Sequence, residues 1–99
     1  MKTFLILFSL SSSGAFASTQ VECVAGNYVF HVQNTFQNEL KISFMEEEVF
    51  ADGLLDKAEV DLVAKFKSIG EMTLFAKIGK KLPENYVFLQ GRKFSVFCR

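Results

Sequence analysis

The sequence predicts an all-β fold, a small antiparallel meander of about eight strands that is closed or nearly closed into a barrel. From residue 21 onward, runs of about five to eight residues alternate apolar with polar side chains, as in a half-buried strand. Gly, Asn, Asp or Pro separates these runs at hairpin spacing. The only two cysteines, Cys23 and Cys98, lie near the two ends of the alternating region, so one disulfide can join the first and last strands. An open sheet or a two-layer sandwich, its edges joined by the same bond, is the alternative to a barrel.

Residues 1–17 have the features of a secretory signal peptide. Lys2 supplies a positive charge, residues 4–10 are an apolar run, and residues 15–17 form an Ala-x-Ala cleavage pattern. The apolar run is shorter than the ~20 residues that span a bilayer. We therefore expect an exported protein, periplasmic or secreted, with no transmembrane segment after cleavage and with residues 18–99 as a single β domain.

Export makes a disulfide between Cys23 and Cys98 the expected state of the two thiols. A domain of about 80 residues buries little apolar surface, so a covalent link adds much to its stability. Closing a loop of about 75 residues removes denatured-state entropy equivalent to roughly 4 to 4.5 kcal/mol. Both cysteines also fall in the inward phase of their strands, which suits a bond between the first and last strands.

The first four strands are short alternating runs bounded by turn-forming residues: 21–25, 27–33, 39–45 and 48–51. Gly26, residues 34–38 and the Asp52-Gly53 pair supply Gly, Asn and Asp for the turns that follow the first, second and fourth of them. We expect Asp52-Gly53 to form a hairpin turn.

The last four strands follow the same rule: 59–67, 71–78, 86–90 and 93–99. Gly70, residues 79–85 and Gly91 supply the turns between them. Residues 55–69 also show helical spacing, and Asp56 and Glu59 have the spacing of a capping box. Alternation from residue 59, broken only at Val63, favours a strand, but a helix here would make the domain α+β.

Strand alternation assigns one side chain in two to the core. The inward set is Val21, Cys23, Ala25, Tyr28, Phe30, Val32, Leu40, Ile42, Phe44, Val60, Leu62, Ala64, Phe66, Met72, Leu74, Ala76, Ile78, Phe94, Val96 and Cys98. Four phenylalanines take the outward phase: Phe50, Phe75, Phe88 and Phe97. They are a candidate apolar interface if they lie together, and ordinary single exposed residues if they do not.

Charge is distributed unevenly along the chain. Residues 39–61 hold eight acidic and two basic residues, a net charge of −6, whereas residues 62–99 hold eight basic and two acidic residues, a net charge of +6. Five of the basic residues form a candidate surface for an anionic partner: Lys77, Lys80, Lys81, Arg92 and Lys93. Such a partner is an acidic protein or an anionic surface polymer. Nucleic acid is not expected, because the chain is nearly neutral and carries no nucleic-acid-binding motif. Alternatively, these residues only keep sheet edges from pairing between molecules.

Residues suited to catalysis or metal binding are few. His31 is the only histidine, and it lies in the polar phase of its strand. The acidic run at residues 46–48 lacks the ordered spacing and glycine of an EF-hand loop. We therefore expect a protein that is not an enzyme and that uses no cofactor and no metal.

In outline, the chain is similar to the small periplasmic inhibitors of C-type lysozyme. The shared features are export, an early cysteine just before an antiparallel meander, and a last cysteine near the C-terminus. That family's Ser-Gly-Ala-Arg-Tyr loop is absent, and the chain has no Trp, so the resemblance places no inhibitory residue on this sequence. We expect an exported, non-catalytic binding module, with inhibition of a secreted or cell-wall-directed enzyme as one form. The alternative is a structural or self-associating envelope or surface component.

Overall fold

The computed structural model describes residues 19–35 and 39–99. The predicted signal peptide, residues 1–17, lies outside this part of the chain, as do residues 36–38. The described strands are β1 (Gln20–Ala25), β2 (Tyr28–Asn34), β3 (Leu40–Phe44), β4 (Glu47–Ala51), β5 (Gly53–Leu55), β6 (Glu59–Phe66), β7 (Gly70–Lys77), β8 (Tyr86–Leu89), β9 (Arg92–Ser95) and β10 (Phe97–Cys98). The prediction of an all-β domain is confirmed for this part of the chain. The helical alternative for residues 55–69 is wrong, because β5, a turn and β6 occupy most of that segment.

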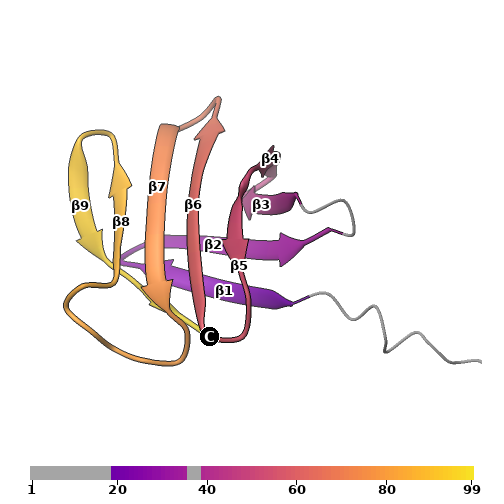
Figure 1. The fold of residues 1–99 in the computed structure, drawn as a ribbon. Helices are drawn as coiled ribbons and strands as arrows, with labels where there is room; N and C mark the ends of the chain where they lie inside the picture. The colour runs from indigo at the N-terminus through magenta and orange to yellow at the C-terminus, as the bar shows by residue number, and fades with distance from the viewer. Residues whose placement is uncertain (1–18, 36–38) are drawn as a thin grey trace, which may run out of the picture.

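The strands form two five-stranded antiparallel sheets rather than a closed barrel (Figure 1). Sheet 1 has the order β10-β1-β2-β3-β4, and sheet 2 has the order β5-β6-β7-β8-β9. The strands of sheet 1 cross those of sheet 2 at a steep angle (Figure 1), as in orthogonally packed sandwiches. The predicted barrel is therefore wrong and the two-layer alternative holds.

The described part contains no helix with the length and apolarity of a membrane span.

Ten strands replace the predicted eight because the meander passes from one sheet to the other at two corners. At Asp52 the chain leaves β4 and enters β5, so the predicted hairpin turn at Asp52-Gly53 is a corner instead. At Val96 the predicted strand 93–99 divides into β9, which pairs with β8, and β10, which pairs with β1. A Cβ atom on Gly53 would lie 2.7 Å from the Asp61 carbonyl oxygen. Glycine therefore permits the close approach of backbones that forms the first corner.

The core lies between the two sheets and consists of the predicted inward side chains. Each of them is buried, apart from Tyr28, Ile78 and Phe94, which are half-buried against the core. Leu55, Val87 and Leu89 complete it. Aromatic rings connect the layers: the centroids of Phe44 in sheet 1 and Phe66 in sheet 2 lie 6.1 Å apart in an edge-on contact.

A disulfide joins Cys23 on β1 to Cys98 on β10, as predicted. The two residues are direct cross-strand partners, and neither side chain is accessible to solvent. Both strands belong to sheet 1, so the bond holds the edge strand β10 to β1, and β9 of sheet 2 leads directly into β10.

On the other side of the molecule, Glu47 links the start of β4 to the turn between β6 and β7. Its carboxylate accepts hydrogen bonds from the backbone N–H of Lys67, the backbone N–H of Ser68 and the Ser68 hydroxyl. The Ser68 hydroxyl, followed by the Lys67 N–H, lowers the pKa of Glu47 below the usual glutamate value. β4 and β6 belong to different sheets and share no backbone hydrogen-bond ladder, so the Glu47 carboxylate links the two sheets at this point.

Candidate functional site

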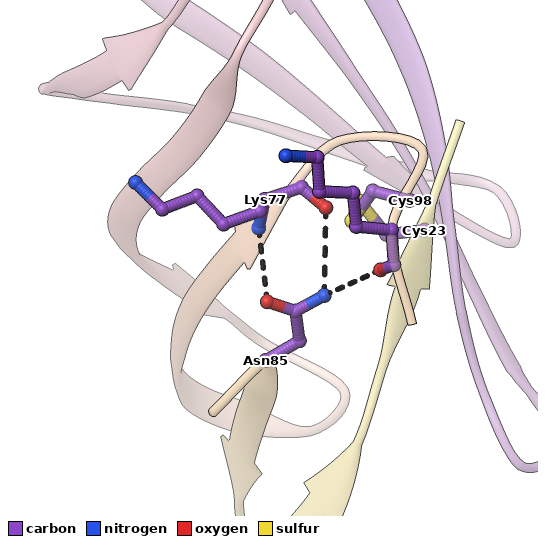
Figure 2. Close-up of a disulfide and its surroundings, with 5 residues drawn as sticks. Cys23, Lys77, Asn85 and Cys98 are labelled. Carbon is purple, nitrogen blue, oxygen red and sulfur yellow. Dashed lines mark hydrogen bonds between the residues drawn. A yellow bond between two sulfur atoms is a disulfide. The ribbon is translucent and has the colours of Figure 1, made fainter. Parts of the chain in front are cut away.

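The loop between β7 and β8, residues 78–85, is held by one buried polar side chain. Asn85 is 1 % exposed, and no other polar side chain in the described ranges is buried. Its Oδ1 accepts a hydrogen bond from the Lys77 N–H at 3.0 Å, and its Nδ2 donates to the Lys80 carbonyl at 2.8 Å (Figure 2). A longer contact of 3.4 Å runs from Nδ2 to the Lys77 carbonyl. The side chain thus replaces backbone hydrogen bonds that the loop cannot make itself.

Backbone hydrogen bonds tie the same loop to its surroundings. The Gly79 N–H donates to the Cys98 carbonyl at 2.7 Å, beside the disulfide, and the Ile78 N–H donates to the Ala58 carbonyl at 2.9 Å. Within the loop, the Asn85 N–H donates to the Leu82 carbonyl at 3.1 Å. We call residues 78–85 the basic loop, because two exposed lysines, Lys80 and Lys81, lie between these anchors.

The three lysines at this end of sheet 2 differ in their contacts. Lys77 forms an ion pair with Glu59, in which its ammonium donates a hydrogen bond to the carboxylate. This hydrogen bond raises the pKa of Lys77. The Lys81 ammonium lies 5.6 Å from the ring centroid of Phe97. Lys80 is exposed and has no ion pair with any described side chain. Lys80 and Lys81 are therefore the charges most available to an anionic partner.

The other two residues of the predicted basic surface lie elsewhere. Arg92 is next to the β8–β9 turn, at the far end of the hairpin from the basic loop, and its guanidinium stacks 5.6 Å from the Phe94 ring. Lys93 lies on the outer face of sheet 2, where its ammonium is 5.1 Å from the ring centroid of Tyr86. The structure thus brings Lys77, Lys80 and Lys81 together, but not all five.

The four predicted outward phenylalanines are divided between the sheets. Phe50 is 57 % exposed on β4, and Phe97 lies on β10, so these two occupy opposite edge strands of sheet 1. Phe75 and Phe88 lie on the neighbouring strands β7 and β8 of sheet 2. Three residues outside the predicted set lie on the same outer face. We call the resulting group the aromatic strip: Leu54, Val63, Phe75, Tyr86 and Phe88.

The aromatic strip was only partly foreseeable. Val63 was the one apolar residue in the polar phase of its predicted strand, which was a usable signal. Tyr86 begins a strand of four residues, where alternation carries little information. Leu54 lies between the predicted strands 48–51 and 59–67 and outside the ambiguous segment 55–69, so the sequence assigns it no face.

The outer face of sheet 1 carries a polar groove of about 240 Å³. Cross-strand pairing places His31 between Glu22 on β1 and Ser43 on β3, and Arg99 forms an ion pair with Glu22 at 3.4 Å. No hydrogen bond joins His31 to Ser43 or Glu22 in the described structure. The row therefore lacks the base-to-nucleophile contact of a catalytic triad.

Metal-ligating side chains do not cluster in the described ranges: no group of three His, Cys, Asp or Glu residues could hold an ion. No protein-family model, curated protein or solved structure matches the chain. Geometry and charge therefore carry the functional argument, and they single out the basic loop and the aromatic strip.

Proposed function

We propose that the protein is an exported, non-catalytic binding module that presents the basic loop to an acidic partner protein. The observation that carries the proposal is the fixation of the loop by buried Asn85, which holds the backbone that carries Lys80 and Lys81 before any partner is bound. A loop held in its bound shape loses little conformational entropy on association, so more of the interaction energy appears as affinity.

The form of partner that suits this loop is an enzyme with carboxylates in its substrate cleft. Most enzymes that cut cell-wall glycans use two carboxylates flanking the scissile bond. A lysine on a loop with a fixed backbone that enters such a cleft gains charge-assisted hydrogen bonds and blocks the substrate. Inhibition of a secreted or cell-wall-directed glycosidase is therefore the function we propose for the basic loop.

Inhibition assays with purified cell-wall glycosidases, beginning with C-type lysozyme, test the proposal. We expect the oxidised protein to inhibit one of them, and Lys80→Glu or Lys81→Glu to weaken inhibition about tenfold or more, because each places a like charge against the cleft. Lys65→Glu is the matched control, since Lys65 lies beside the β6–β7 turn, at the opposite end of β7 from the loop. Asn85→Ala should also weaken inhibition, although it changes no charge.

Two results would overturn this proposal. The first is that the protein inhibits none of the glycosidases tested. The second is that Lys65→Glu reduces inhibition as much as the loop variants do. Binding to a polyanion such as polyglutamate that is insensitive to Asn85→Ala would instead identify the loop as a general site for anionic polymers, because flexible charge alone would then suffice.

A further inference from the structure

The aromatic strip crosses the four neighbouring strands β5 to β8 on the outer face of sheet 2. Leu54, Val63 and Phe88 are 43 %, 49 % and 44 % exposed. Phe75 and Tyr86 lie between them, with ring centroids 6.3 Å apart. In the cross-strand rows Asp61 lies between Leu54 and Phe75, and Thr73 lies between Val63 and Phe88. The three aromatic residues of the strip are neighbours on β7 and β8. An exposed apolar group of this kind usually marks a contact site, and the charges on β6 and β9, on either side of it, indicate what it contacts.

Charged side chains of both signs border the strip. The same outer face carries three acidic and three basic residues: Glu59, Asp61, Glu71, Lys65, Lys77 and Lys93. Four of these are matched within the sheet, because Lys77 forms an ion pair with Glu59 and Lys65 lies opposite Glu71. Asp61 on β6 and Lys93 on β9 remain without an ion pair to any described residue, one on each side of the three aromatic residues of β7 and β8.

Lys93 leans along its strand toward the row that contains Asp61. Its Cα is paired with Phe88, but its ammonium lies over the ring of Tyr86. Tyr86 is paired with Phe75, and Phe75 with Asp61, so these residues form one cross-strand row. Leu54 precedes Asp61 in that row and Ser95 is its member on β9, so Lys93 belongs to the neighbouring row by pairing, and only its ammonium reaches the row of Asp61. The strands that carry the two unpaired charges, β6 and β9, are three strand spacings or roughly 14 Å apart.

We propose that this face is a symmetric interface between two copies of the chain. A two-fold axis parallel to the strands, between β7 and β8, places β6 of one copy over β9 of the other. Asp61 of each copy then meets Lys93 of the other, and Phe75 and Phe88 pack against their counterparts beside the axis. A foreign partner with one dominant sign of charge would be repelled at one flank, whereas a second copy matches both.

The size of the face sets the strength of the association. Four strands and about three rows of side chains cover roughly 20 Å by 20 Å, or about 400 Å² per copy. Stable complexes bury about 800 Å² per partner. The dimer is therefore weak and in rapid exchange, and we expect to detect it at protein concentrations between about 10 µM and 1 mM. It does not depend on the basic loop, so either proposal can fail alone.

Charge exchange between the flanks tests the symmetry directly by sedimentation equilibrium of the purified, oxidised protein. Asp61→Lys and Lys93→Asp should each weaken dimerisation about tenfold or more, because each brings like charges together twice. An equimolar mixture of the two variants should dimerise as the wild type does, since every contact then joins opposite charges. The double variant carrying both changes should recover in the same way.

Two exposed phenylalanines provide the matched control. Phe88→Ser should abolish the dimer, whereas Phe50→Ser, which removes a still more exposed ring from sheet 1, should leave it unchanged. A wild-type protein that stays monomeric at 1 mM would overturn the proposal. So would a mixture of the charge variants that remains monomeric, or a loss of dimer in Phe50→Ser as large as that in Phe88→Ser.

Discussion

Replacing Asn85 with Ala should destabilise the domain more than any other single change in the basic loop. The variant loses the hydrogen bonds of 2.8 Å and 3.0 Å to the main chain at Lys80 and Lys77, together with the longer 3.4 Å contact. A neutral hydrogen bond contributes about 1 kcal/mol net, and a buried group left without a partner adds to the loss. We therefore expect the free energy of unfolding to fall by about 2 to 3 kcal/mol, which lowers Tm by roughly 10 to 20 °C for a domain of this size.

Urea denaturation and native-state amide exchange measure this prediction. The free energy of unfolding gives the global loss, and the Lys77 and Gly79 amides should exchange faster if the loop itself opens. Ser95→Ala, which removes an exposed hydroxyl from β9, is the control and should change stability by less than about 0.5 kcal/mol. A loss for Asn85→Ala no larger than that of the control would refute the claim that this side chain fixes the loop.

Three further predictions concern the disulfide within sheet 1 and two features that join the sheets, Glu47 and Gly53. Replacing both Cys23 and Cys98 with Ala should cost about 4 to 4.5 kcal/mol in urea denaturation; a loss below about 2 kcal/mol would mean that the reduced chain is already restricted. The lowered pKa of Glu47 means that its contribution is complete above the unfolded-state pKa and is lost as pH falls through the folded-state pKa. Glu47→Gln should therefore flatten the acid side of the stability profile measured by thermal melts, and an unchanged profile would count against this. Gly53→Ala should destabilise by about 1 to 3 kcal/mol because its Cβ meets backbone, whereas higher stability would show that the corner has room.

Strand alternation predicted the two faces well because side-chain direction has a period of two whichever sheet a strand joins. The same property explains why the barrel prediction failed. Phe94, Val96 and Cys98 keep the inward phase throughout, although the chain passes from sheet 2 to sheet 1 between them. Alternation is unchanged by such a corner, so it cannot reveal one. Gly53 marks the first corner in the sequence, but a hairpin turn and a corner both favour glycine, so the residue does not distinguish them.

The candidate site was predictable where charge or exposure is visible locally, and not where it depends on distant contacts. Lys80 and Lys81 are adjacent basic residues in a turn, and their exposure follows from that. Asn85 looks like any turn asparagine in the sequence, because its burial depends on how the whole loop folds over the end of β7. Arg92 is close to Lys81 in the sequence, but the β8–β9 hairpin carries it to the far end of the sheet.

The charge split along the chain changes meaning once the corners are known. Residues 39–61 are acidic and residues 62–99 are basic, which on a simple meander would give one acidic side and one basic side. The corner at Asp52 instead carries the last part of the acidic segment into sheet 2, where β6 runs beside the basic strands. Asp61 therefore shares an outer face with Lys93. Acidic and basic residues that are separated along the sequence thus share one outer face. A face that carries both signs of charge is the arrangement that a self-complementary interface needs.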